Sequence, residues 1–428
     1  MKTDGIRISF FDLVSALSTS MDLVSPAIVN HQMRVAYIAF CIGKELGLSQ
    51  DQQGELLIAG ALHDSGAFSL KERLDILNFE FQDPHKHAEL GYLLLKNFKP
   101  FADVSGIVRF HHVLWNDGIG TEFNAMAVPI GSHILHLSDR ASVLINEEQE
   151  IIGQSKMISG FLKKGAGKLF VPEIVDAFRR ASDRESFWFD VMSPHINIIV
   201  RRLGGINNAA INDEILLDLA DLFRRLIDFR SRFTATHSSG VVASAESLAR
   251  LAGFSSEECL YMRVAGSFHD LGKLAVPAEI LEKPGKLTED EFAVVKRHAY
   301  HSYTIMDHIK GLETINKWAS FHHERLDGSG YPFRVRGEEL SVGSQIMAVA
   351  DVFTAITENR PYRKGMGSED AKSILNRMAQ NSALNPDIVA LLTDNFDEVN
   401  SLRMAAQEIS IKEYGEFINP QNPMLFDI

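Results

Sequence analysis

The chain has 428 residues, of which 23% are charged, and a formal net charge of −13. This length favours two domains, and the acidic balance excludes a protein that wraps a long nucleic acid, because that function needs a broad basic surface. The sequence has no apolar run long enough for a membrane span, no signal-peptide pattern and only two cysteines, so we expect a cytosolic protein with no membrane partner.

The predicted elements are helices. Ser49 and Ser255 each stand 14 residues before a His-Asp pair and are predicted N-caps of helices that end at that pair. Thr288–Glu291 predicts a capping box, and the apolar spacing over 341–351 predicts a helix carrying Asp351. Strand-like runs are few and short, so we expect an all-α fold made of two tandem helical bundles.

The two halves of the chain repeat one pattern of histidines and aspartates. In the first half the pattern is His31, His63, Asp64, His87, His111, His112 and Asp139; in the second half it is His237, His269, Asp270, His298, His322, His323 and Asp351. The first histidine precedes the His-Asp pair by 32 residues in both halves, and the third precedes the His-His pair by 24. This register predicts a duplicated domain. The polar stretch 201–213 interrupts the helical pattern, so the expected domains are 1–200 and 208–428.

The repeated residues have the composition of a metal centre. Five imidazoles and two carboxylates spread over several helices can project inward from a bundle, and mixed nitrogen and oxygen ligands suit transition metals. Seven ligands suit two ions with a carboxylate between them. A lone histidine is more often structural, and His301 and His308 are assigned to that class. Repetition of the whole set argues against scattered surface residues.

Three segments carry a family resemblance. HDLGK (269–273), HHERLDGSGYP (322–332) and RPYRKGM (360–366) resemble the HD-GYP subfamily of the HD superfamily of metal-dependent phosphohydrolases. The resemblance implies hydrolysis of a cyclic dinucleotide second messenger, either cyclic di-GMP or the 3′,3′ hybrid cyclic GMP-AMP, to a linear dinucleotide. It also implies two divalent ions, such as iron or manganese. Trinuclear members have a glutamate where this chain has Phe233, which favours two ions.

The resemblance assigns roles to individual residues. It implies one metal bound by His237, His269 and Asp351, a second bound by His298, His322 and His323, and Asp270 bridging the two. Such ions lower the pKa of a shared water and present hydroxide to phosphorus. Asp270 and Lys273 are the expected catalytic residues, and Arg360, Arg363, Gly330 and Tyr331 the expected substrate contacts. The loop also implies a diguanylate cyclase-type partner, and a homodimer is one possible assembly.

The first copy keeps the seven metal positions but departs elsewhere. Ala67 stands at the position of Lys273, and Glu148 and Ile151 stand where the second half has two arginines. We therefore predict a degenerate N-terminal domain that binds metal, turns over a dinucleotide poorly and regulates the other copy. Action on a different, less charged substrate is the alternative.

Three other functions remain open at this point. A non-catalytic cyclic dinucleotide receptor would bind through the same metals, and a nucleotide phosphohydrolase of the wider HD superfamily would share the ligand set. A di-iron oxygenase would use a similar bundle and depend on oxygen. The sequence alone leaves open the preferred bases, the metal, the oligomeric state and the regulatory input.

Overall fold

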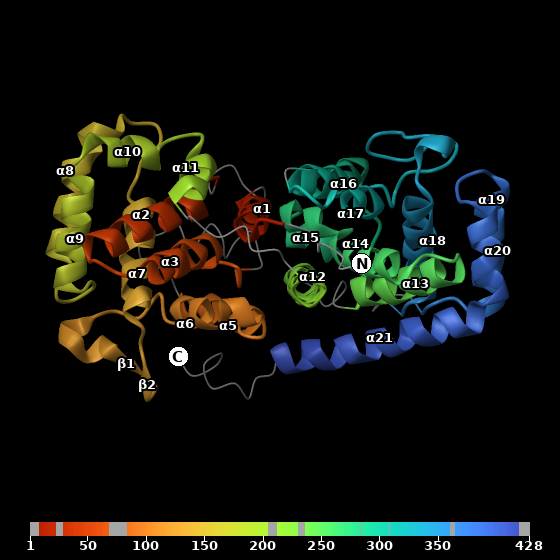
Figure 1. The fold of residues 1–428 in the computed structure, drawn as a ribbon, viewed down its shortest axis with the longest axis horizontal. Coiled ribbons are helices and arrows are strands. Elements are labelled where there is room, and N and C mark those ends of the chain that lie inside the picture. Colours follow the sequence, from red (N-terminus) through yellow and green to blue (C-terminus); the bar gives the residue numbers. More distant parts are fainter. Residues whose placement is uncertain are drawn as a thin grey trace. The chain divides into compact units, whose positions relative to one another are not determined.

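The computed structural model describes residues 8–22, 29–67, 84–203, 212–229, 236–283, 285–307, 309–359 and 364–418. Phe233, His308, Arg360 and Arg363 lie outside these ranges. The chain forms two compact units, one made mainly of Ser9–Asn208 and the other of Ala209–Ile418 (Figure 1). Within the described residues, no helix combines the length and the apolar character that crossing a bilayer requires.

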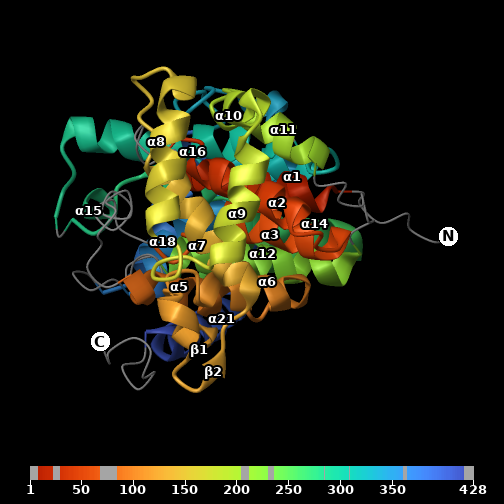
Figure 2. The same cartoon turned by 90° about the vertical axis from the view of Figure 1, so that its left-hand side faces the viewer.

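The described residues of the first unit form helices and one short hairpin. Its elements are α1 (Phe10–Asp22), α2 (His31–Glu45), α3 (Gln50–Leu62), α5 (Pro84–Leu95), η2 (Lys99–Phe101), α6 (Ala102–Arg109), η3 (Asn116–Thr121), β1 (Glu122–Phe123), β2 (Met126–Ala127), α7 (Ile130–Val143), α8 (Ile151–Lys164), α9 (Pro172–Ser182), α10 (Glu185–Val191) and α11 (Ile196–Leu203). Strands β1 and β2 are antiparallel. Figure 2 views this unit from the side of α8 and α9.

The second unit repeats the order of the first. Its elements are α12 (Asp213–Asp228), α13 (His237–Leu251), α14 (Ser256–Phe268), η4 (Leu271–Ala275), α15 (Ala278–Leu281), α16 (Glu289–Asp307), α17 (Glu313–Ser320), η5 (Gly337–Glu339), α18 (Val342–Thr357), α19 (Ser368–Gln380), α20 (Pro386–Asp394) and α21 (Phe396–Phe417). The expectation of two tandem all-helical bundles is confirmed.

The predicted helix starts are also confirmed. Ser49 and Ser255 each form a capping box with the residue three positions later, which satisfies free N–H groups at the helix start. Thr288 and Glu291 exchange the same pair of bonds before α16, at 3.2 and 2.7 Å. The side chain of Ser341 caps α18. These caps fix where the helices that carry the metal-ligand candidates begin.

One helix lies at the centre of each bundle. In the first unit α2 packs against α3, α7 and α9, and in the second α13 packs against α14, α18 and α21 (Figure 1). Each central helix begins with the first histidine of the repeated pattern, His31 or His237. The packing of the neighbouring helices around it brings the other members of the pattern to the same place.

A glycine after each His-Asp pair allows the next helix to approach closely. A Cβ atom added to Gly272 would lie 2.0 Å from the carbonyl oxygen of His298, and one added to Gly66 would lie 2.1 Å from that of His87. Atoms cannot approach to such distances, so only glycine fits. The contact sets the separation between the aspartate of the pair and the third histidine.

Gly272→Ala is therefore expected to destabilise the second unit. Overpacking of a dense interior costs about 1–3 kcal/mol, and here the obstacle is backbone, which cannot rotate away. The matched control is Gly415→Ala in α21, where no described atom lies within 4 Å of an added Cβ and alanine favours the helix by up to about 1 kcal/mol. Urea unfolding of both metal-free variants measures the difference. Equal midpoints would contradict the proposed close approach.

Candidate metal centre

The structure brings the seven residues of the second half together. His237 begins α13, His269 and Asp270 follow α14, and His298 lies within α16. The last three are His322 and His323, which follow α17, and Asp351, which lies in α18. All are buried except His323, whose side chain is 26% exposed. The His-His pair lies just beyond the last helical residue, Ser320, which frees both rings from helical geometry.

Asp270 lies between two groups of histidines. Its Oδ2 atom is 3.1 Å from Nε2 of His269, and its Oδ1 atom is 3.4 Å from Nε2 of His298. His298 in turn lies 3.4 Å from His322, measured between their Nε2 atoms. The two oxygens of one carboxylate thus face different imidazoles, as a bridging ligand requires.

Asp351 faces two further histidines of the cluster. Its Oδ1 atom is 3.1 Å from Nε2 of His237, and its Oδ2 atom is 3.7 Å from Nδ1 of His323. Potential ligand atoms lie within 4.8 Å of one another in two sets. One set is His237, His269 and Asp270, and the other is His298, His322 and His323.

Backbone carbonyls fix the orientation of three of the imidazoles. Nδ1 of His269, His298 and His322 lies 2.7, 2.5 and 2.6 Å from the carbonyl oxygen three residues earlier. An Nδ1–H that donates to a carbonyl leaves Nε2 as the lone-pair nitrogen, and Nε2 faces the cluster. This is the arrangement that metal-binding histidines adopt.

Two atoms of the cluster are buried and unsatisfied. Within the described residues, Nε2 of His269 and Oδ1 of Asp270 have no hydrogen-bond partner. Burying such atoms without a partner costs about 1–3 kcal/mol each, whereas an ion between them would satisfy both. The donor set, its orientation and these unsatisfied atoms all fit divalent transition metals.

The protonation states favour metal binding as well. Burial lowers the pKa of His298 to about 3 and that of His323 to about 4, and it holds the pKa of His322 well below its usual value. Burial opposes ionisation of Asp270, yet the charges of His269 and Lys273 hold its pKa well below its usual range. Near neutral pH His298, His322 and His323 are therefore neutral and Asp270 is ionised, the forms that bind metal. The carboxylates of Glu358 and Asp351 instead outweigh burial and raise the pKa of His237 to about 10, so a metal must displace a proton from that imidazole.

Lys273 lies at the edge of the cluster. Its Nζ atom is 2.5 Å from Oδ2 of Asp270, and its side chain is 18% exposed. The ammonium group therefore points toward the bridging carboxylate and remains accessible from solvent.

The loop after the His-His pair is held by a buried carboxylate that the sequence analysis missed. Glu324 is 2% exposed and accepts backbone N–H groups from Phe333, Arg334 and Val335, at 2.7, 3.1 and 3.1 Å. The available signal was its position directly after the two ligand candidates, where the first copy has an apolar Val113. This carboxylate closes the loop onto the cluster.

The two loop residues expected to contact substrate have different surroundings. A Cβ atom on Gly330 would lie 2.5 Å from both the amide nitrogen of Arg325 and Cα of Glu324, so the glycine permits the loop to fold on itself. The ring of Tyr331 lies 4.7 Å from that of His323, centroid to centroid. Tyr331 is thus the one of the two that flanks a metal-ligand candidate through its side chain.

The first copy assembles the equivalent seven residues. Nε2 of His31 lies 3.3 Å from Oδ1 of Asp139, and the carboxylate of Asp64 lies 3.1 Å from His63 and 3.5 Å from His87. Two candidate ligand sets are again present, His31 with His63 and Asp64, and His87 with His111 and His112. The duplication predicted from sequence therefore extends to the geometry of the cluster.

Two further side chains occupy the first cluster and were missed by sequence comparison. The guanidinium of Arg140 lies 2.6 Å from Oδ2 of Asp139, and the amide of Gln32 donates to Oδ2 of Asp64 at 3.1 Å. The second copy has Val352 and Ser238 at these positions. Both carboxylates of the first cluster thus carry a protein partner that would compete with a metal.

The loop of the first copy is also held differently. Val113, at the position of Glu324, is buried with Phe110 against Phe123, Met126 and Val128. An apolar cluster therefore anchors the β1–β2 hairpin, where the second copy uses a carboxylate and backbone amides.

Comparison with known proteins is consistent with this duplication. Residues 28–144 and residues 221–388 each match a family model described as an HD domain. The chain is 29% identical over 413 residues to the 3′3′-cGAMP-specific phosphodiesterase 1 of Vibrio cholerae, and the match covers 94% of each protein. A cyclic di-GMP phosphodiesterase of Pseudomonas aeruginosa is 39% identical over 158 residues, which are 36% of this chain and 37% of that protein.

A solved structure shares the fold over nearly the whole chain. It is that of the cyclic GMP-AMP-specific phosphodiesterase V-cGAP3 of V. cholerae, with a TM-score of 0.63 and 23% identity, covering 91% of this chain and 98% of that one. The chain therefore belongs to the HD-domain family, with one HD domain in each half and the HD-GYP motifs in the second.

Proposed function

We propose that this protein is a metal-dependent phosphodiesterase that hydrolyses a cyclic dinucleotide, with its active site in the second HD domain. The observation that carries the proposal is the buried cluster around Asp270, with oriented imidazoles and unsatisfied ligand atoms. The relatives support the substrate class, since they are named as phosphodiesterases of 3′3′-cGAMP and of cyclic di-GMP. The hybrid dinucleotide is favoured, because the relative that matches along 94% of the chain is named for it.

The residues of the cluster would hold two divalent ions such as iron or manganese. As the family resemblance implies, His237, His269 and Asp351 would hold one ion, His298, His322 and His323 the other, and Asp270 would contribute to both. Ions held there would lower the pKa of a water and neutralise charge on the phosphodiester. The chain itself orients the imidazoles through the backbone carbonyls and keeps Asp270 ionised.

Other residues would bind the substrate. The ammonium of Lys273, beside Asp270 at the edge of the cluster, would contact a non-bridging phosphate oxygen. Tyr331 borders the cluster beside His323 and suits stacking on a base. For Arg360 and Arg363, which lie outside the described residues, the phosphate-binding role is the one that the family resemblance implies.

The first HD domain is proposed to be a weak or inactive copy. Arg140 and Gln32 bind the carboxylates that a metal would need, and Ala67 provides no cation. We infer that residues 1–200 support or regulate the catalytic domain of residues 208–428 and contribute little hydrolysis.

Hydrolysis of a small substrate panel tests the proposal. Full-length protein is loaded in turn with manganese, iron or nickel and supplied with cyclic di-GMP, cyclic di-AMP or 3′,3′-cyclic GMP-AMP. We expect the enzyme to convert the hybrid dinucleotide and cyclic di-GMP to their linear dinucleotides. Chromatography of the reaction products measures this conversion. If the protein binds a cyclic dinucleotide saturably but cleaves none of them with any of the three metals, the proposal is overturned and a non-catalytic receptor is favoured.

A further inference from the structure

Glu358 is a second buried carboxylate that the sequence analysis missed. It follows α18, is 3% exposed, and its Oε2 atom lies 3.2 Å from Nδ1 of His237. In His269, His298 and His322, Nδ1 instead lies against the backbone carbonyl oxygen three residues earlier. His237 begins its helix and has a carboxylate partner from the residue that directly follows α18.

A buried hydrogen-bonded chain holds Glu358 in place. The amide of Gln407, in α21, donates to Oε2 of Glu358 and to the carbonyl oxygen of Thr236, both at 3.2 Å. The oxygen of the same amide accepts from the guanidinium of Arg403, which is 4% exposed. Gln407 thus fixes both Glu358 and the residue directly before His237.

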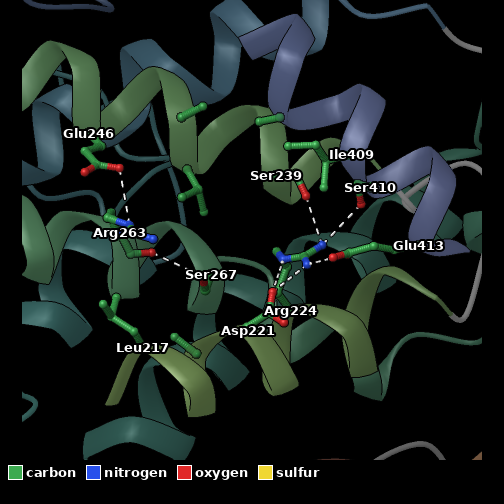
Figure 3. A pocket seen from close by; sticks show the side chains of 14 residues that line it. Leu217, Asp221, Arg224, Ser239, Glu246, Arg263, Ser267, Ile409, Ser410 and Glu413 are labelled. Atoms are coloured by element: carbon green, nitrogen blue, oxygen red, sulfur yellow. Dashed lines mark hydrogen bonds and ion pairs between the residues drawn. The ribbon is translucent and has the colours of Figure 1, made fainter. Parts of the chain in front are cut away.

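Helix α21 is itself anchored to the helix that carries His237. In Figure 3 the guanidinium of Arg224, from α12, lies at one side of a cavity of about 340 Å³. It donates to Ser239 of α13 at 2.9 Å, and to Ser410 and Glu413 of α21 at 3.2 and 3.0 Å. These bonds fix α21 against α13 within two turns of Gln407.

The first copy lacks this arrangement. Nδ1 of His31 lies 3.2 Å from the neutral hydroxyl of Ser142. The position of Glu358 is occupied by Asn146, whose side-chain oxygen accepts the amide N–H of Glu148 in its own loop. The carboxylate behind the first histidine therefore distinguishes the two clusters.

We propose that Glu358 is a positioning residue for one metal: it accepts Nδ1–H of His237, directs Nε2 toward the cluster and raises the basicity of that nitrogen. This inference rests on the metal centre of the proposed function. Carboxylates behind ligating histidines typically contribute about 10–100-fold to metal affinity. Asp351, 3.1 Å from the same Nε2, marks the side on which the ion binds.

The test measures binding of Mn²⁺ alone to metal-free, full-length protein by calorimetry, without substrate. The Asp270→Ala variant identifies which binding events belong to the second cluster. Glu358→Ala is expected to weaken one of those events by about 10–100-fold. Glu358→Gln, whose neutral amide oxygen still accepts a hydrogen bond, should recover the part of the affinity that depends on the orientation of His237. The matched control is Glu398→Ala, which removes a half-exposed carboxylate of α21 that pairs with Arg250.

The outcomes separate the two proposals. Unchanged Mn²⁺ affinity in Glu358→Ala would overturn the positioning role, while the metal centre would stand. A wild-type protein whose Mn²⁺ binding equals that of Asp270→Ala would overturn the metal centre itself. A purely structural role predicts that Glu358→Ala and Glu358→Gln lower the Tm of the metal-free protein in proportion to their loss of affinity. The proposal instead predicts a metal-free Tm close to wild type for Glu358→Gln.

Discussion

Asp270→Ala is expected to lower cyclic dinucleotide hydrolysis by more than about 100-fold. Residues that only hydrogen-bond to metal ligands contribute up to about 100-fold to activity, and a direct ligand should contribute more. The reason is geometric, because the two oxygens of Asp270 face His269 and His298 in different ligand sets. Removing the carboxylate therefore affects both metal positions. Hydrolysis at saturating manganese, together with the bound metal measured by mass spectrometry, checks the expectation.

The duplicated chain supplies a matched control for this variant. Asp64→Ala removes the equivalent carboxylate of the first copy, which lies 3.1 Å from His63. We expect it to retain hydrolysis, because the proposed active site is in the other domain. Loss of activity in Asp64→Ala, with the second cluster still loaded with metal, would contradict the assignment of catalysis to the second half.

Lys273→Ala is expected to have the second largest effect. Removing a cation that contacts charge developing in a transition state costs about 10²–10³-fold in kcat. The side chain is partly exposed, so the change should leave folding intact. Single-turnover hydrolysis with the metal content held equal to wild type measures the chemical step.

The same variant distinguishes two roles for the lysine. Nζ of Lys273 lies 2.5 Å from Oδ2 of Asp270, so one possible role of the lysine is to compete with a metal for that carboxylate. That role predicts tighter Mn²⁺ binding and unchanged turnover in Lys273→Ala. A role on the phosphate predicts a large loss of kcat, whatever happens to metal affinity.

Much of the scaffold could be predicted from the sequence because its signals are local. A capping serine and the residue three positions later, as at Ser49 and Ser255, are close in any helix start. The cluster could be predicted for a different reason: the chain contains it twice, and two copies in register act as an internal comparison.

The residues that were missed depend on contacts the sequence does not encode locally. Glu358 contacts His237 across 121 positions of the chain. From the sequence alone Glu324 would be expected on the surface, because its burial depends on the loop that folds back over it. Arg140 directly follows Asp139, yet neighbours on a helix normally point apart, so the ion pair between them was not expected.

The clasp formed by Glu324 has a consequence for how this enzyme class can diversify. Its carboxylate binds three backbone N–H groups, which every residue except proline possesses. The exposed side chain of Arg334 can therefore be exchanged for residues that tolerate its left-handed backbone, φ 58°, without releasing the loop, whereas Glu324 cannot be exchanged. Side chains of this loop can thus vary while the adjacent pair, His322 and His323, keeps its place.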